Sequence, residues 1–411
     1  MFQLLSNFLY LLAKPVMTYV LRKKLYPEDA ISRKYGNIPE ADFTENDNVI
    51  MFHGVSVGEI NALENLVKRA RKEFPDSKLV ITTGTHTGQE IARKKFGDIA
   101  DLITYFPADF PCVVKKFLDK INPDKVCIAE TEIWPNFAIE CKRRGIDIYI
   151  INGRISDSTF KSYLMLKPLF RYFLSFYTGI YTQSDEDNAK FLAIGANPEI
   201  TKRMNNLKFD IKKPEVEFDF DKNGSRILLA GSTHSGEDEI VLYEFRRLKE
   251  KYPDLKLIIA PRHLTRSDEV VALIDSFKFN YDSRSNNRNS MRDIDILILD
   301  TLGELGKMYK FSDISFIGGS FNKTGGHNPL ESIVFEKPVI SGPSIHNFKD
   351  IYSIITNAGA GFVVDDRDEL FEKADKLLGD NEFYQQTVKN CAKVFREQQG
   401  ALEFVINLLK E

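Results

Sequence analysis

The sequence predicts an α/β protein of two Rossmann-like domains that face a central cleft. Its 411 residues exceed the roughly 250–300 residues at which a single hydrophobic core stops growing. Short apolar runs alternate with amphipathic stretches through both halves, which is typical of parallel strands covered by helices on both faces. A polar, proline-containing connection near residues 211–224 separates the halves. Ligands bind beyond the carboxyl ends of such strands, so the residues that follow each run are the candidate site.

Residues 1–25 differ in composition from both domains. Leu, Phe and Tyr dominate them, Pro15 interrupts them, and Arg22, Lys23 and Lys24 close them. A membrane-spanning helix needs about 20 predominantly apolar residues, which this segment lacks. A signal peptide carries its positive charges before its apolar region, which is the reverse of the order found. The pattern favours an anchor helix lying in the membrane interface, while a spanning helix and a soluble helix packed on the core stay open.

The first domain, residues 26–212, is expected to contain six strands. Its apolar runs lie at residues 48–54, 77–84, 102–107, 125–130, 147–153 and 179–184. Between the first two runs, residues 59–74 carry apolar side chains at the spacing of one helical face, namely Ile60, Leu63, Leu66, Val67 and Ala70. This segment is therefore predicted to be a helix that covers the sheet.

The second domain, residues 213–411, repeats the pattern with five runs. They lie at residues 226–232, 255–262, 295–300, 314–320 and 338–343. Residues 281–293 are expected to form a polar surface loop, and a C-terminal helix is expected from about Phe383 to Lys410. The sequence leaves open whether this last helix packs across onto the first domain.

Composition excludes several classes of function. A net charge of −3 gives no overall reason to expect nucleic-acid binding. The four cysteines form no C-x-x-C pair, which argues against a zinc site or a disulfide framework. The six histidines do not cluster along the chain, and neither a P-loop nor a dinucleotide-binding motif after a first strand is found. We therefore expect no metal and no cofactor.

The strand ends of the second domain suit a nucleotide. Ser232 and Thr233 lie in a small-residue turn before a helix, where free N–H groups and the helix dipole favour phosphate. The alternative is an ordinary helix with Ser235 as its N-cap. Arg262 and His263 follow the next run, and a cation there pairs well with phosphate, unless Arg262 is a plain surface charge.

The densest group of glycines is GGSFNKTGGHNPLES, residues 318–332. Its four glycines, Gly325 and Gly326 among them, allow a backbone to approach a ligand closely; the alternative is a long flexible turn. Asn328 suits the N-cap of a following helix, and Glu331 in its first turn could accept both hydroxyls of a ribose. Together with the neighbouring strand ends, this stretch favours nucleotide binding.

The strand ends of the first domain suit a sugar acceptor, because hydroxyls and carboxylates dominate them. Glu59 stands at a helix start, where a carboxylate is either a general base or a partner of the helix dipole. Arg154 and Lys161 could engage an anionic acceptor or be ordinary surface charges. The remaining candidates for acceptor contacts are Ser56, Gly58, Thr83, Thr85, Glu132 and Trp134.

These motifs together resemble those of the bacterial 3-deoxy-D-manno-octulosonic acid (Kdo) transferases of lipopolysaccharide assembly. They occur in the family's order up to about residue 350: HGVSVGE, TTGT, YFPAD, TEIWPN, NGRISDSTF, NLKFD, AGSTHSGE, PRH, DTLGEL and GGHNPLE. The resemblance implies a GT-B fold whose C-terminal domain holds the donor CMP-Kdo. It also implies a lipid A precursor as acceptor, reached at the cytoplasmic face of the inner membrane through the N-terminal anchor.

The resemblance also assigns roles to individual residues. Glu59 matches the family's catalytic base, which takes the proton of the acceptor hydroxyl while CMP leaves, with inversion and without a metal. Ser232 and Thr233 would lie near the phosphate or the Kdo carboxylate, and Glu331 would hold the ribose. The positions that fall in the CMP-binding motifs are Arg262, Gly326, Asn328 and Glu331.

Two stretches depart from the family's pattern. Asn205 stands where a glycine usually precedes Asn206, and Leu264, Thr265 and Arg266 follow PRH in place of Pro-Glu-Arg. Two other classes remain as alternatives. A nucleotide-sugar 2-epimerase needs neither an anchor helix nor a TEIWPN segment, and a scaffold without chemistry has no reason to keep Glu59 beside GGHNPLE. The number of Kdo units added, the acyl preference and the oligomeric state stay open.

Overall fold

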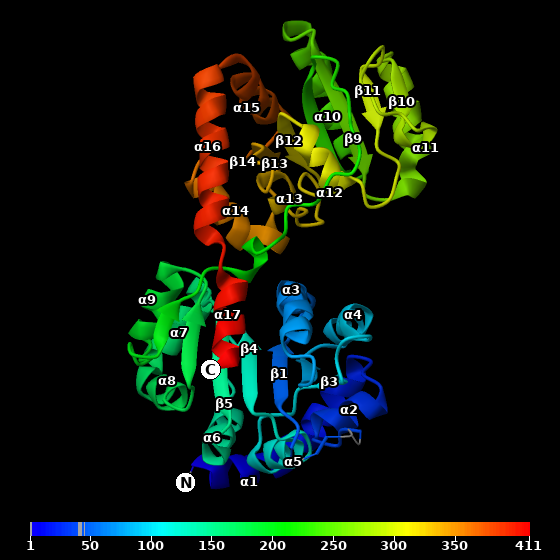
Figure 1. Cartoon of the computed structure of the whole chain (residues 1–411). Helices are drawn as coiled ribbons and strands as arrows, with labels where there is room; N and C mark the ends of the chain where they lie inside the picture. The colour runs from blue at the N-terminus through cyan, green and yellow to red at the C-terminus, as the bar shows by residue number, and fades with distance from the viewer. Residues whose placement is uncertain (1, 40–42, 45) are drawn as a thin grey trace. The chain divides into compact units, whose positions relative to one another are not determined.

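The computed structural model describes residues 2–39, 43–44 and 46–411. It divides into two compact units, which are unit 1, Met1–Asp210 with Gln398–Glu411, and unit 2, Ile211–Glu397. Each unit contains a seven-stranded sheet with helices around it (Figure 1). The chain enters unit 2 directly after Asp210, at the start of the polar connection expected from the sequence.

The sheet of unit 1 is parallel and has the order β3-β2-β1-β4-β5-β6-β7. Its strands are β1 Val49–Gly54, β2 Lys78–Thr83, β3 Leu102–Tyr105, β4 Lys125–Ala129, β5 Asp147–Gly153, β6 Gly179–Thr182 and β7 Thr201–Arg203. Its helices are α1 Phe2–Lys23, α2 Glu28–Lys34, α3 Val57–Glu73, α4 His86–Phe96, α5 Pro111–Ile121, α6 Pro135–Arg144, α7 Asp157–Met165, α8 Lys167–Leu174, α9 Asp185–Ala193 and α17 Ala401–Lys410, with a 3₁₀ turn η1 Leu207–Phe209.

Helices cover both faces of this sheet because successive residues of a strand point to opposite sides. Ile50 and Phe52 of β1 join one core cluster with residues of α3, α4 and α17, whereas Met51 joins another with residues of α5 and α6. The predicted helix 59–74 is confirmed as α3, and all five of its predicted core residues are fully buried: Ile60, Leu63, Leu66, Val67 and Ala70.

The sheet of unit 2 is also parallel, in the order β10-β11-β9-β8-β12-β13-β14. Its strands are β8 Arg226–Thr233, β9 Leu255–Pro261, β10 Tyr281–Ser283, β11 Ile296–Ile298, β12 Ile314–Ile317, β13 Val339–Ser341 and β14 Gly361–Val363. Its helices are α10 Glu237–Lys251, α11 Ser267–Phe277, α12 Leu305–Met308, α13 Leu330–Ile333, α14 Lys349–Asn357, α15 Arg367–Gly379 and α16 Asn381–Gln398, with 3₁₀ turns η2 Leu264–Arg266, η3 Arg284–Asn286, η4 Tyr309–Phe311 and η5 His346–Phe348.

The C-terminal segment corrects the predicted boundary of the second domain. It forms two helices, α16 and α17, joined at Gly400, whose φ is 99°. The second of them belongs to unit 1, where Val405 and Ile406 are fully buried in the core cluster. The Asp210 carboxylate holds its start by accepting the N–H groups of Gly400 (2.8 Å) and Leu402 (2.6 Å). Residues 398–411 therefore do not belong with residues 213–397.

All eleven predicted strands are present, and the described residues form three more that the sequence did not predict. These are β7, β10 and β14, each three residues long and each at the edge of its sheet. The expected surface loop 281–293 is thus wrong at its start, where β10 pairs with β11. These short edge strands are only partly buried and show no continuous buried apolar run, unlike the equally short inner strands β11 and β13.

The N-terminal segment is a helix, α1, that joins α2 and α5 in unit 1. The Thr18 hydroxyl lies 2.8 Å from that of Tyr35, and the Tyr35 hydroxyl donates to the Lys14 carbonyl at 3.1 Å. Several large apolar side chains of this segment are exposed, among them Leu11 (69%) and Leu25 (85%). Within the part of the chain that the structure describes, no helix is both long enough and apolar enough to cross a membrane.

Candidate active site

The candidate residues of unit 1 gather at one edge of its sheet. β1, β2, β4 and β5 are neighbours in the order β2-β1-β4-β5 and run in the same direction. Their carboxyl ends lead into HGVSVGE, TTGTHTG, AETEIWPN and NGRISDSTF. Four separate stretches of sequence therefore begin at the same edge of this sheet.

Glu59 lies in the first turn of α3, with 8% of its surface exposed. The backbone N–H of Val55 donates to its Oε2, and the Ser56 hydroxyl donates to Oε1 at 3.1 Å. Ser56 is also the N-cap residue of α3, but its side chain makes no capping hydrogen bond to the backbone and is bound to Glu59 instead. The loop between β1 and α3 thus folds back on its own glutamate and fixes the direction of the carboxylate.

Two further carboxylates follow β4, the neighbour of β1. Burial, together with the negative charges of Glu130 and Glu132, raises the pKa of Glu59 to about 7 against the opposing hydrogen bonds from Val55 and Ser56. Burial and the charge of Glu130 likewise raise the pKa of Glu132 to about 6. Glu130 has a φ of 61°, an uncommon conformation for a residue other than glycine. With a pKa of about 7, the Glu59 carboxylate can accept a proton near neutral pH.

Thr83, the last residue of β2, and Thr85, just after the strand, differ from the expectation that they face the acceptor. Thr83 is fully buried and its hydroxyl donates to Gln89 Oε1 at 2.5 Å. Thr85 caps α4 by accepting the Gly88 N–H at 3.1 Å, and its hydroxyl also lies 3.1 Å from the Val55 carbonyl. Both side chains therefore stabilise the loop, and Thr83 is too deeply buried to contact an acceptor.

Trp134 is held by the core as well as by the site. Its ring packs against Phe106, with centroids 5.3 Å apart, and Phe106 packs against His53 at 4.0 Å. The Trp134 backbone N–H is bound to the Tyr177 hydroxyl at 3.1 Å, while its indole Nε1 is buried with no hydrogen-bond partner among the described residues. Burial lowers the pKa of His53 to about 3, so this imidazole is neutral at physiological pH.

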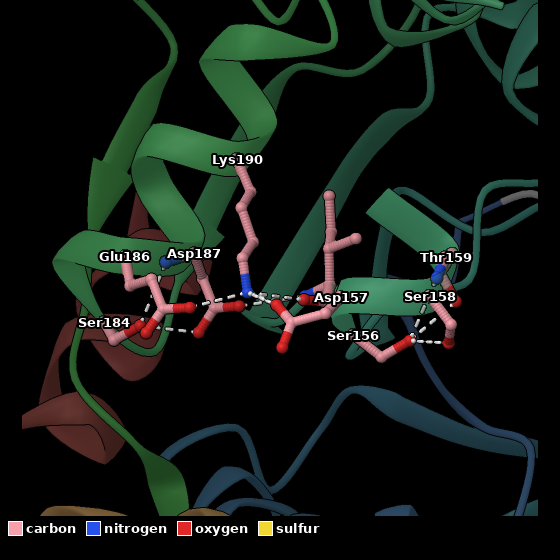
Figure 2. A network of polar contacts seen from close by, with 9 residues as sticks. Ser156, Asp157, Ser158, Thr159, Ser184, Glu186, Asp187 and Lys190 are labelled. Atoms are coloured by element: carbon pink, nitrogen blue, oxygen red, sulfur yellow. Dashed lines mark hydrogen bonds and ion pairs between the residues drawn. The ribbon is translucent and has the colours of Figure 1, made fainter. Parts of the chain in front are cut away.

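The loop after β5 is fastened to α9 by a polar network (Figure 2). Lys190 reaches the Ile155 carbonyl at 3.2 Å and the carboxylates of Asp157 (2.8 Å) and Glu186 (2.7 Å). The Ser156 hydroxyl caps α7. This network fixes the segment that begins at Arg154, which is half-buried directly after β5; Lys161 lies exposed further along, on α7.

The first strand of unit 2 ends in a loop that resembles the β1–α3 loop in sequence. Ser232 is buried and has a φ of 55°. Glu237, 1% exposed, accepts four backbone N–H groups, from His234 (2.9 Å), Gly319 (2.6 Å), Ser320 (2.8 Å) and Phe321 (2.9 Å). This glutamate therefore anchors the glycine-rich stretch to the end of β8. The helix is preceded by Gly236, so the alternative of Ser235 as N-cap is wrong.

Thr233 and Arg266 complete the same loop. The Thr233 hydroxyl donates to Asp238 at 2.5 Å, Arg266 forms an ion pair with the same buried carboxylate, and the Thr233 carbonyl accepts the N–H of Arg262 at 2.9 Å. Thr233 is thus fully buried and its hydroxyl is bound within the loop, whereas we expected it to lie beside the donor. Arg262 and His263 are exposed, as a contact with an incoming anion requires.

Three of the six histidines meet in unit 2, which their positions in the sequence did not indicate. The rings of His234 and His327 are stacked with centroids 5.1 Å apart, and their Nε2 atoms are 2.8 Å apart. His263 approaches His234 edge-on at 5.9 Å. Burial and the charge of Arg262 lower the pKa of His327 to about 4. Among the described residues, no group of three or more His, Cys, Asp or Glu side chains is arranged to hold a metal ion.

The glycines of GGSFNKTGGHNPLES meet other parts of the same unit. A Cβ at Gly318 would overlap the Ser232 carbonyl, and one at Gly325, whose φ is 98°, would overlap the ring of His346. Other parts of the same unit approach Gly318 and Gly325 too closely for a side chain, so both positions require glycine. Gly326 is buried as well, with a φ of 77°.

The residues that close this stretch lie at the start of α13. The Asn328 side chain accepts the Leu330 N–H at 3.1 Å, so it does bind the first turn of α13, although Pro329 is the cap residue. Glu331 is half-buried, and burial raises its pKa against the opposing charge of Arg262.

Comparison with known proteins identifies the family. Residues 29–211 match the family model of 3-deoxy-D-manno-octulosonic-acid transferase. A transferase of that name from Haemophilus influenzae is 33% identical over 88% of this chain and 86% of its own length, and one from Rickettsia felis is 31% identical over 92% and 80%.

A solved UDP-GlcNAc 2-epimerase from Neisseria meningitidis superposes with a TM-score of 0.55, covering 89% of this chain and 100% of that one. Its sequence identity is 13%, so the likeness concerns the fold and leaves the epimerase alternative without support from sequence. The two parallel sheets share this architecture with GT-B glycosyltransferases. The chain belongs to the 3-deoxy-D-manno-octulosonic acid (Kdo) transferase family and is a glycosyltransferase.

Proposed function

We propose that this protein transfers Kdo from CMP-Kdo to a lipid A precursor in lipopolysaccharide assembly, with Glu59 as the general base. The observation that carries the proposal is the carboxylate of Glu59, buried, oriented by Val55 and Ser56, and raised in pKa to about 7. A base is most effective when its pKa lies near the working pH, and an ordinary surface glutamate would be too weak.

The proposed step is an inverting displacement. Glu59 removes the proton from a hydroxyl of the acceptor sugar as that oxygen attacks the anomeric carbon of Kdo. The bond from this carbon to the phosphate oxygen breaks, and its electron pair leaves with CMP. Attack and departure occur on opposite faces of the carbon, which inverts it. Atoms and charge balance without any co-reactant.

The donor would be held in unit 2. Arg262 and His263 are exposed at the end of β9 and offer positive or hydrogen-bonding groups to a phosphate. Glu331, at the start of α13 beside the charge of Arg262, is the proposed partner of the ribose hydroxyls, with Gly326 and Asn328 beside it in the sequence. Ser232 would lie near the phosphate or the Kdo carboxylate.

The acceptor would be met in unit 1 and at a membrane. Glu132, Arg154 and Lys161 are the proposed polar contacts, together with Ser56 and Gly58 next to the base. Attachment through α1 is supported by an exposed apolar set on both sides of the exposed cations Arg22, Lys23 and Lys24. The set comprises Leu11, Leu12, Val16, Tyr19, Val20 and Leu25.

Transfer to a tetraacylated lipid A precursor, with CMP-Kdo generated in the assay, tests the chemistry. Glu59→Gln should lower kcat by about 10²–10⁴-fold. Glu186→Gln, in the first turn of α9 with its side chain 75% exposed, is the matched control and should be fully active. For the wild type, kcat/KM should rise with pH through about 7, because the base must be ionised. Full activity of Glu59→Gln would place the base elsewhere, and product mass would count the Kdo units.

Flotation with lipid vesicles tests the attachment. Wild-type protein should float with vesicles that contain anionic lipid, and the substitution Val16→Asp should reduce the bound fraction. Leu302→Asp, an equally drastic change at a side chain of unit 2 that is 86% exposed, should leave binding unchanged. Equal binding by all three proteins would remove α1 from the proposal.

A further inference from the structure

A lysine of the N-terminal segment reaches the loop that precedes α4. Lys34 is the last residue of α2, and its ammonium donates to the carbonyl of Gly84 at 2.7 Å. The ammonium lies over the rings of Tyr26 and Tyr105, 5.5 and 5.2 Å from their centroids. The Tyr26 hydroxyl donates to the same carbonyl at 3.3 Å. The two donors thus fix the position of one peptide group.

That peptide group is in contact with the residue that holds Glu59. The N–H groups of Gly84 and Thr85 both donate to the Val55 carbonyl, at 3.1 and 3.0 Å. A Cβ on Gly84 would come within 2.6 Å of Val55 Cγ1, so no side chain fits between the two strands' ends. The Val55 N–H in turn donates to Glu59 Oε2. A continuous path of hydrogen bonds therefore runs from Lys34 to the carboxylate.

The placement of Lys34 is electrostatically costly, which argues against a role in packing alone. Burial lowers its pKa to about 8, yet it forms no ion pair with a carboxylate among those found in the described residues. A methionine would fill the same space without a charge to desolvate. The groups around it are Tyr26, Tyr105 and His53, with His86 bound to the Tyr105 hydroxyl at 3.0 Å, and none of these is a carboxylate.

We propose that Lys34 is a positioning residue for the proposed base, acting on Glu59 through Gly84 and Val55. By clamping the Gly84 carbonyl it keeps the Gly84 and Thr85 N–H groups on Val55, which keeps the Val55 N–H on Glu59. Tyr35, next to Lys34 in the chain, is bound to Thr18 of α1, so the residue beside the clamp is held to the segment proposed to meet the membrane. This inference rests on the proposed role of Glu59.

The test compares two lysine-to-methionine variants of the full chain. Lys34→Met removes the clamp, whereas Lys120→Met removes a comparable bond, from Lys120 to the Ile38 carbonyl at 3.3 Å, elsewhere in unit 1. We expect Lys34→Met to lower kcat at least tenfold with KM for CMP-Kdo within twofold of wild type. Loss of the Val55 hydrogen bond, which favours the ionised form, should also move the acid limb of kcat to higher pH. Lys120→Met should change neither.

A second readout is independent of the chemistry. Amide hydrogen exchange at Val55, Gly84 and Thr85 should quicken in Lys34→Met and stay at the wild-type rate in Lys120→Met. Lys34→Gln, which keeps an N–H donor for Gly84, is the second variant if Lys34→Met does not fold, and it should recover part of kcat. Unchanged exchange and an unchanged pH profile in a folded Lys34→Met would overturn the inference.

The two proposals fail in different ways. If Glu59→Gln is inactive and Lys34→Met behaves as wild type, the clamp is wrong and the base stands. If Glu59→Gln is fully active, the base is wrong, and the inference about Lys34 is overturned with it, whatever the exchange rates show.

Discussion

Glu59 and Glu237 occupy comparable places in the two units, yet the structure gives them opposite tasks. Each follows the first strand of its unit's sequence, β1 or β8, and each lies in the first turn of the next helix. Glu59 receives one backbone N–H and one hydroxyl, and it faces the charges of Glu130 and Glu132. Glu237 receives four backbone N–H groups.

The number of donors aimed at a buried carboxylate decides what it can do. Four N–H groups occupy the acceptor positions of the Glu237 carboxylate, which is thereby committed to holding its loop. Glu59 has only two donors and lies near two negative charges, which destabilise its ionised form and raise its pKa. The sequences HGVSVGE and GSTHSGE look alike because both begin a helix after a strand, and the loops that close over them make the difference.

Removing each glutamate should give the largest contrast. Glu237→Ala leaves four largely buried N–H groups without an acceptor, which we expect to cost about 5 kcal/mol and to release the loop at Gly319–Phe321. Glu59→Ala strands a single N–H and should change the free energy of unfolding by about 1 kcal/mol or less. Chemical denaturation of both variants measures this. Equal losses would mean that Glu59 is also an anchor.

Glu59→Gln should increase the free energy of unfolding, and the increase should grow with pH. The pKa of Glu59 in the fold, about 7, is higher than in an unfolded chain, so its favourable contribution is complete below about pH 4.5 and is lost as pH rises through 7. A neutral glutamine avoids that loss. We expect the gain over wild type to grow between pH 5 and 8, to at most about 3 kcal/mol. Denaturation curves at several pH values provide the measurement, and a gain independent of pH would contradict the raised pKa.

Two glycine substitutions separate packing from chemistry. Gly318→Ala brings a methyl group onto the Ser232 carbonyl and should cost about 2 kcal/mol. Gly58→Ala, where the nearest atom to a new Cβ is Ser56 Oγ at 3.8 Å, should leave the melting temperature unchanged. If the acceptor occupies that open space beside Glu59, the same variant should lose activity. An active, stable Gly58→Ala would place the acceptor elsewhere.

The smallest effect is expected in the network after β5. Lys190→Met removes ion pairs to Asp157 and Glu186, whose side chains are 86% and 75% exposed, and such pairs contribute little. Together with the bond to the Ile155 carbonyl, the loss should be about 1 kcal/mol. Thermal melts at low and high salt check it. A loss several times larger would show that this loop is anchored as firmly as that of Glu237.

Much of the fold could be predicted because the signal is local and repeated. Continuous apolar strands and the face of α3 reveal themselves through spacing alone. The edge strands β7, β10 and β14 could not be predicted, since they are short and only partly buried, whereas the equally short inner strands β11 and β13 are fully buried and belong to apolar runs. Asn205 shows how a departure from the family's pattern is tolerated. Its φ is 70°, and asparagine enters this left-handed region more readily than most residues other than glycine.

The candidate site was predictable by position and much less so by role. Sequence placed Thr83 and Thr233 at strand ends, but their hydroxyls are buried against Gln89 and Asp238. It also offered no reason to pair His234 with His327, which lie far apart along the chain and meet only across neighbouring strands. Arg262 and His263, in contrast, remain exposed where they were expected.

The sequence by itself determined the two parallel sheets, the convergence of their strand ends and the family, because each depends on patterns read within a few residues. Only the tertiary structure decided which polar groups are already satisfied. In the folded protein Glu237, Asp238 and Thr83 hold loops in place. Lys34 is bound to Gly84, and the charge of Glu130 lies near Glu59. The reason is physical, since the pKa and hydrogen-bonding capacity of a group depend on burial and on neighbours brought together from distant parts of the chain.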